Sequence, residues 1–298
     1  MCEVRTVRWA LAAVVSLSMG VVSARAVITG PYTADADTLH LYHFDEAEGS
    51  GSAVDTGSAG TLRDLSVGST AVQGAPSYAG FGSSLDTTAM HENTHAVSDV
   101  MAQSEMQGAD GAFTFEAIVQ VSDLIGFPET EILIARQLPD NIAFQWRLNG
   151  RDSGSMDLMG VWQMWSDREA ITAAIPTDGP HAWVAGEWFH VAVAYTGVEN
   201  TAGNVQMYWT RLSDSVTEAN AIETTGMFTR DLIDVNGPMP TSIANRLGQD
   251  DENLPGSIDE VRISGIARGA GDFLLVPEPA TAVLLGLGAL AMLRRRSA

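Results

Sequence analysis

The sequence predicts an all-β protein built as a two-sheet antiparallel sandwich, and three observations lead to this prediction. Apolar and polar residues alternate over many short segments, which is the period of a half-buried strand. Turns rich in glycine, asparagine and aspartate separate these segments. Between Thr38 and Phe273 there is hardly any sustained helical period. Many short strands with regular turns over about 235 residues are typical of a single sandwich.

The clearest strands are expected at residues 113–121, 188–195 and 205–209, where every second residue is apolar. Segment 188–195 is apolar on both faces, as a central strand covered on two sides should be. Residues 197–204 predict the hairpin loop between the second and third of these strands. Further strands are expected at residues 132–135, 142–148, 156–165 and 258–264.

The N-terminal residues 1–26 are typical of a secretory signal peptide. Arg5 and Arg8 give the positive start, an apolar run follows, and Ala24-Arg25-Ala26 matches the cleavage pattern. The apolar run covers residues 10–22, which is shorter than the roughly 20 residues of a membrane-spanning helix. Cys2 is the only cysteine, so the mature chain is expected to contain no thiol and no disulfide.

The C-terminal residues 276–298 form a second targeting segment. The motif Pro277-Glu278-Pro279 precedes an apolar run, 280–293, and Arg294-Arg295-Arg296 follows it. As a helix the run is about 21 Å long, so it predicts a short transmembrane helix with its arginines in the cytoplasm. This order resembles the PEP-CTERM sorting signal of exported bacterial proteins. The resemblance implies an exosortase-type processing enzyme as a partner; the simpler alternative is a weak tail anchor.

Four blocks between the two ends resemble the LamG-like jelly-roll domain of the concanavalin A-like lectin/glucanase superfamily. They are LHLYHFDEAEGSGSAVDTG at 39–57, FTFEAIVQV at 113–121, GEWFHVAVAYTG at 186–197 and GSIDEVRISGIAR at 256–268. The resemblance implies one jelly-roll domain over residues 27–275, often with calcium at its rim and a carbohydrate-binding, adhesive or spacer role. Residues 60–111 show little regular pattern, and residues 167–180 are expected to form an inserted loop.

Composition excludes several classes of protein. The 37 acidic residues outnumber 16 basic ones, all arginine, for a net charge of −21. Such a chain cannot offer nucleic acid the basic face that it needs. Because the chain contains no lysine, it cannot form a phosphate-binding P-loop. Without a mature cysteine, Cys-His catalysis is excluded as well.

The segment His91-Glu92-Asn93-Thr94-His95 matches the pattern HExxH, in which two histidines one helical turn apart bind zinc. Asn93 and Thr94 are weak helix formers, and Met101 stands where one subclass has its third histidine. We therefore interpret the match as accidental; a zinc protease would require a helix over residues 89–101.

Two places are candidates for a calcium site. Residues 249–253 form a dense acidic loop that includes Asp250 and Asp251, and Ca²⁺ prefers six to eight oxygen ligands. The alternative is a solvated loop. Asp259 is expected to share a strand face with Val261 and Ile263, so its charge would need a partner there. The family resemblance implies calcium between such an aspartate and backbone carbonyls, here near residues 48–49.

Six tryptophans follow the signal peptide, and most are expected in the core because tryptophan is highly buried on average. Trp162, Trp165 and Trp183 lie near the expected insertion. They are the candidates for exposed platforms that stack on sugar rings.

These observations predict an exported, non-catalytic protein of the bacterial cell surface or extracellular matrix that binds a polysaccharide or surface glycan, or is adhesive. The tail would anchor it transiently in the inner membrane before release to the surface or exterior. Two alternatives stay open: a polysaccharide-active enzyme on the same fold, and a structural spacer without a ligand. The E-x-D-x-x-E motif of laminarinase-like enzymes on this fold is missing from the chain.

Overall fold

The computed structural model describes residues 31–123, 129–137, 141–150, 154–163, 167–213, 216, 218–235, 237–250 and 252–273. These residues form two antiparallel sheets of eight and nine strands. Among them, helical structure is limited to two short 3₁₀ turns, Gln103–Glu105 and Ala270–Asp272. The predicted all-β sandwich is confirmed.

The eight-stranded sheet contains the three strands with the clearest sequence pattern at its centre. Its order is β14 (Ala221–Ile222), β13 (Val205–Arg211), β12 (Trp188–Tyr195), β7 (Phe113–Val121), β17 (Gly256–Ser264), β5 (Ser83–Asp86) and β4 (Val72–Pro76), with β1 (Thr38–Tyr42) also paired to β17.

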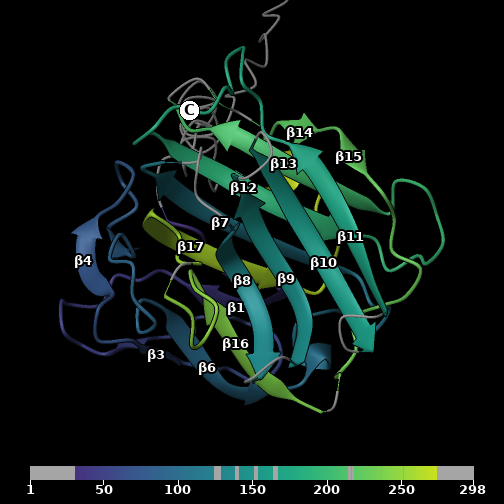
Figure 1. Cartoon of the computed structure of the whole chain (residues 1–298), viewed down its shortest axis with the longest axis horizontal. Coiled ribbons are helices and arrows are strands. Elements are labelled where there is room, and N and C mark those ends of the chain that lie inside the picture. The colour runs from purple at the N-terminus through teal and green to yellow at the C-terminus, as the bar shows by residue number, and fades with distance from the viewer. Residues whose placement is uncertain are drawn as a thin grey trace, which may run out of the picture.

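The nine-stranded sheet contains the remaining strands. Its order is β15 (Thr224–Thr225), β11 (Asp167–Ala174), β10 (Ser155–Gln163), β9 (Asn141–Asn149), β8 (Glu129–Gln137), β16 (Met239–Ile243), β6 (Ala96–Met101), β3 (Leu65–Val67) and β2 (Ser52–Ala53). Figure 1 looks onto this sheet, with β8, β9, β10 and β11 in front of β7 and β12.

The main core lies between the two sheets. Aromatic rings from both sheets meet there, with the ring centroids of Phe115 in β7 and Phe144 in β9 only 5.1 Å apart. The apolar faces expected for 113–121, 188–195 and 205–209 all point into this core. Each large apolar side chain buried in this way contributes about 1.5–3 kcal/mol, so the shared core holds the sheets together.

The outer face of the eight-stranded sheet is covered by segments from both ends of the described chain. Tyr32, which precedes β1, and Phe273, which follows the last 3₁₀ turn, pack with Ile118, Ala192 and Tyr208 in a second apolar cluster. The Phe273 ring centroid lies 5.0 Å from that of His190 and 4.8 Å from that of Tyr208. This sheet is therefore buried on both faces.

One sequence expectation about the middle of the chain is wrong, and one segment without a clear pattern contains strands. Residues 167–174, expected within an inserted loop, form strand β11 at the margin of the nine-stranded sheet. Only Ile171 and Ala173 of this strand reach the core, so its apolar pattern is too short to recognise. Residues 60–111, which show little pattern, contain β3, β4, β5 and β6.

A bulge in β17 overturns the expected position of Asp259. Asp259 is paired with Ile118, but Arg262 is paired with Glu116, so the register shifts between them. Glu260 takes the left-handed backbone conformation, with φ of 51°, which is typical of a strand irregularity. Val261 and Ile263 accordingly face the core, whereas Asp259 faces outward with Ile118.

Candidate functional site

Strands β8, β9 and β10 direct polar side chains away from the core. On β9, Phe144, Trp146 and Leu148 belong to the core. Successive side chains of a strand point to opposite faces, so Gln145 and Arg147 point to the outer face of the nine-stranded sheet. These two side chains point away from the core, although β9 lies in the middle of the nine-stranded sheet.

A one-residue bulge in β8 brings Glu131 to the same face. Glu131 is paired with Arg147 and Leu133 with Trp146, which leaves Ile132 as the extra residue. Leu133 faces the core, so regular alternation would direct Glu131 there too. The bulge reverses this, and the backbone amide of Ala244 donates to the Ile132 carbonyl at 3.0 Å.

On β10, Asp157 is paired with Arg147 and completes a line of side chains across three strands. We call this set the polar row: Glu131, Gln145, Arg147 and Asp157. Gln145 Nε2 donates to Glu131 Oε1 at 2.9 Å, and one guanidinium nitrogen of Arg147 lies 3.6 Å from Asp157 Oδ2. The row thus consists of two pairs on neighbouring strands, an amide with a carboxylate and a guanidinium with a carboxylate.

Asp157 also binds two side chains at the margin of the row. Asn149 Nδ2 donates to Asp157 Oδ2 at 3.2 Å, and Ser155 Oγ donates to Oδ1 at 3.0 Å. Beside the row, Ile134, Met159 and Val161 belong to a small apolar cluster on the same sheet. The row therefore combines hydrogen-bonding groups with a neighbouring apolar surface.

The burial of the polar row is graded. Glu131 and Gln145 are 0 % exposed, while Arg147 and Asp157 are 9 % and 6 % exposed. Asn149 and Ser155 are half-buried, and Arg168 on β11 is exposed. The row is therefore fully buried at Glu131 and Gln145, and its half-buried margin lies at Asn149 and Ser155, where β9 ends and β10 begins. The sequence did not predict the row, because its only signal is one or two polar residues inside each of three largely apolar strands.

The outer face of the other sheet carries a second buried network. Glu116 of β7 accepts from Arg262 Nε and lies 3.2 Å from His190 Nε2, and Arg268 Nε lies 4.0 Å away. Burial alone would raise the pKa of Glu116, but Arg262 and His190 hold it below its ordinary value. Arg268 also binds Asp35 at 2.8 Å, which ties this network to the N-terminal segment.

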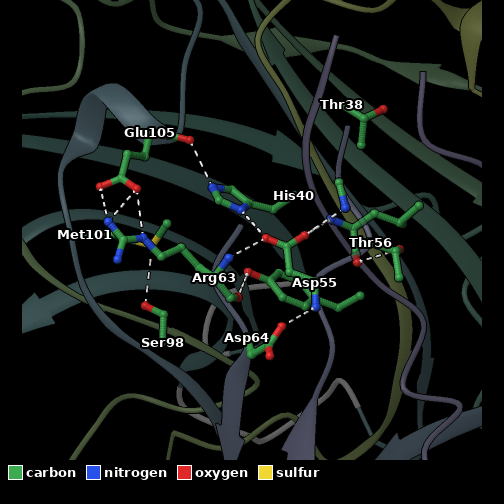
Figure 2. A network of polar contacts seen from close by, with 12 residues as sticks. Thr38, His40, Asp55, Thr56, Arg63, Asp64, Ser98, Met101 and Glu105 are labelled. Atoms are coloured by element: carbon green, nitrogen blue, oxygen red, sulfur yellow. Dashed lines mark hydrogen bonds and ion pairs between the residues drawn. The ribbon is translucent and has the colours of Figure 1, made fainter. Parts of the chain in front are cut away.

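A third network, shown in Figure 2, joins the strand β1 to the first 3₁₀ turn. His40 Nδ1 lies 2.6 Å from Asp55 Oδ2, and its Nε2 lies 3.1 Å from the Glu105 carbonyl oxygen. Asp55 also accepts from the backbone amides of Leu41 and Arg63 at 3.1 and 2.8 Å. Both ring nitrogens and both carboxylate oxygens thus have protein partners, which indicates a structural role.

The tryptophan candidates are distributed unevenly. Trp183 is half-buried and packs against the main core. Trp162 belongs to β10, but its side chain lies outside the described residues, as does all of Trp165. A groove of ≈ 500 Å³, lined by residues that include His181, Glu187 and Arg211, lies at the adjoining loop. A single tryptophan candidate is therefore placed, and it is directed toward the core.

The calcium candidates are not brought together as one carboxylate cluster. Asp250 is exposed, and Asp251 lies outside the described residues. Within the described ranges no group of three or more His, Cys, Asp or Glu side chains is placed to hold a metal ion. Asp259 is buried and accepts from the Ser77 hydroxyl and from the Glu260 amide, the latter at 2.7 Å. Burial raises the pKa of Asp259 to about 9.

The HExxH segment lacks the helix that zinc binding requires. Residues 91–95 form a turn, in which the Thr94 amide donates to the His91 carbonyl at 2.9 Å, and β6 follows at once. Asn245 and Asn253 donate to the same carbonyl at 3.1 and 3.0 Å. The turn at residues 91–95 is therefore bound to the segments that contain Asn245 and Asn253, which indicates a structural role.

Comparison with protein families identifies the tail. Residues 275–297 match the PEP-CTERM protein-sorting motif. The motif indicates export and membrane-associated sorting toward the cell surface in bacteria. Pro277, Glu278, Pro279 and the three arginines lie outside the described residues, as do the expected signal peptide and transmembrane helix. Among the helices of the described residues, none has the length and hydropathy to cross a membrane. No curated protein sequence matches the chain significantly.

Solved structures show what the fold resembles. The binding domain of botulinum neurotoxin serotype C1 matches with a TM-score of 0.53 and 12 % identity, over 80 % of this chain and 51 % of that one. The binding domain of serotype G matches with a TM-score of 0.52 and 10 % identity, over 78 % and 49 %. The binding domain of neurotoxin DC, in complex with SialylT, matches at 0.51 and 11 %, over 80 % and 50 %. This chain spans about half the length of these structures, and the likeness shows a shared sandwich fold.

Proposed function

We propose that this protein is an exported, non-catalytic component of the bacterial cell surface or matrix that binds glycans through the polar row. One observation carries the proposal: four polar side chains are buried together on the outer face of the nine-stranded sheet. They lie outside the apolar core that holds the two sheets together. Buried polar groups cost free energy unless they are paired. Sugars offer hydroxyls that both donate and accept, and carboxylates, amides and guanidinium groups complement them.

The tail supplies the second part of the proposal. The sorting motif implies processing by an exosortase-type enzyme, with transient anchoring in the inner membrane through the apolar run. The finer assignment to the LamG-like group stays a proposal, which the four sequence blocks support. A sandwich of similar fold, the binding domain of neurotoxin DC, is solved in complex with SialylT, and the proposal extends ligand binding by such a sandwich to the present chain.

The arrangement of the carboxylates favours binding over catalysis. Glu131 and Asp157 stand on strands separated by β9, so their backbones lie about 10 Å apart, and Arg147 is paired with both. A polysaccharide-active enzyme therefore stays the second candidate.

Calcium remains a proposed partner of Asp259 alone. The carboxylate oxygens of Asp259 and the hydroxyl oxygen of Ser77 meet there, and oxygen is the ligand that Ca²⁺ prefers. The described carboxylates by themselves are too few for a complete shell, so backbone carbonyls would have to complete it.

The test is a glycan array with the full exported protein, purified in detergent, in calcium and again in EDTA. We expect binding that Arg147→Gln and Asp157→Asn abolish, while the exposed-loop variant Asp250→Asn binds as the original does. Binding that EDTA removes would show that the glycan site requires a divalent cation, and Asp259→Asn would then test whether Asp259 holds it. No binding in either condition, from protein whose cooperative unfolding is intact, would contradict the proposal and favour the spacer.

A further inference from the structure

A groove lies beside the outer face of the eight-stranded sheet, where β12 begins and β13 ends. Its volume is ≈ 500 Å³, which lies within the range of about 300–1,000 Å³ for ligand pockets. Leu212 and Val216 connect the groove to the second apolar cluster, which covers this face. We call it the β12–β13 groove; its lining includes His181, Glu187, Arg211, Leu212 and Val216. The polar row belongs to the other sheet, so the groove is a separate place on the molecule.

An ion pair forms the polar wall of the groove. Glu187 precedes β12 and Arg211 ends β13, and Glu187 Oε1 lies 3.1 Å from a guanidinium nitrogen of Arg211. Their side chains are 46 % and 35 % exposed, so both remain accessible to a ligand. A carboxylate only accepts hydrogen bonds, whereas a guanidinium has five N–H groups that only donate. Neighbouring hydroxyls of a sugar, each of which donates and accepts, complement such a pair.

His181 adds a donor of fixed orientation. The backbone amide of Arg211 donates to His181 Nδ1 at 3.3 Å, so Nδ1 carries no proton and the neutral ring has its proton on Nε2. Burial lowers the pKa of His181, which keeps the ring neutral at pH 7. Trp209 Nε1 donates to the His181 carbonyl at 3.1 Å, and this bond holds the residue in place. His181 Nε2 makes no hydrogen bond to a described residue, so its N–H is available to a ligand.

The rest of the lining favours a neutral ligand. Pro180 is exposed and borders the groove together with Leu212, which gives apolar surface for the C–H face of a sugar ring. Among the described lining residues, two carboxylates, Glu187 and Glu218, stand against the guanidinium of Arg211. The whole chain carries a charge of −21. An acidic sugar would therefore meet like charge in the groove.

We propose that the β12–β13 groove binds one neutral hexose unit of a polysaccharide, and that it does so independently of the polar row. Glu187 and Arg211 bind neighbouring hydroxyls, the Nε2–H of His181 donates to a third oxygen, and the sugar ring packs against Pro180. This site goes beyond the proposed function, because it uses the other side of the sandwich. One hexose in an open groove should bind with a dissociation constant on the order of 1 mM, which is too weak to persist on a washed glycan array.

The experiment is calorimetry of the full exported protein with millimolar methyl β-glucoside, β-galactoside, β-mannoside and β-glucuronide. We expect at least one neutral hexoside to bind, and the glucuronide to bind several-fold more weakly. Arg211→Gln and Glu187→Gln should each lower the affinity for the neutral sugar at least several-fold. Arg230→Gln breaks a comparable exposed pair with Asp167. This variant, like Asp157→Asn in the polar row, should leave the affinity unchanged.

The outcomes separate this inference from the proposed function. If no neutral hexoside binds to protein whose cooperative unfolding is intact, while the glycan array is positive, the groove site alone is overturned. A glucuronide that binds as tightly as the neutral sugars would also overturn it, as would an affinity that Arg230→Gln lowers as much as Arg211→Gln. Groove binding with a silent array would keep this site and contradict binding through the polar row. The absence of binding in both experiments would overturn both.

Discussion

The two outer faces of the sandwich bury charged side chains in different ways. On the eight-stranded sheet, Glu116 is held by Arg262 and His190, and segments from both ends of the described chain cover the network. On the nine-stranded sheet, the polar row leaves Gln145 Oε1 without a described partner, and its half-buried margin lies where β9 ends and β10 begins. The first network is completed within the protein, which makes it structural. The second is incomplete, as a binding site before its ligand arrives would be.

The largest expected effect comes from removing Glu116. Glu116→Ala leaves Arg262 buried without its anion, and such losses cost about 3–5 kcal/mol. Urea unfolding should show this as a lower free energy of unfolding. Glu187→Ala breaks the exposed pair with Arg211 and should cost less than about 1 kcal/mol. Equal costs for the two variants would show that the covered network is not structural.

A smaller effect should follow pH, through Asp259 on the covered face. In the folded protein Asp259 keeps its proton up to about pH 9, whereas in the unfolded chain it ionises near pH 4. Its contribution to stability is therefore complete below about pH 4 and is lost as pH rises toward 9, by up to about 1.4 kcal/mol per pH unit.

Asp259→Asn cannot ionise, so this variant should lose that slope. Unfolding free energies at pH 6, 7 and 8 for both proteins would check it. The same slope in both would mean that Asp259 is already charged in the folded state, as it would be when bound to a cation.

The smallest effect on stability is expected in the polar row. Asp157→Asn keeps the size of the side chain and the acceptor oxygen for Ser155, next to the half-buried margin of the row. We expect a change in unfolding free energy below about 1 kcal/mol together with the loss of ligand described above. A loss of stability as large as that of Glu116→Ala would make the row a structural network and remove the distinction between the two faces.

The sequence predicted those parts of the fold whose strands alternate regularly. Segments 113–121 and 188–195 were placed correctly, with the correct residues facing the core, because period-two alternation over eight or nine residues leaves one solution. The polar row could not be predicted, since Glu131 faces outward only through the bulge at Ile132. The bulge at Glu260 likewise moved Asp259 to the opposite face. A register shift of one residue is determined by the neighbouring strands in the sheet. The apolar-polar alternation within one segment carries no information about that pairing.

The packing of Tyr32 and Phe273 on one sheet has a consequence for how the protein is displayed. Both ends of the described chain are attached to the outer face of the eight-stranded sheet, and the sorting motif begins two residues after Phe273. A membrane or matrix that holds the tail therefore holds the domain by that side. The polar row lies on the opposite side of the sandwich from Phe273, so a protein held by its tail would present the row away from the point of attachment.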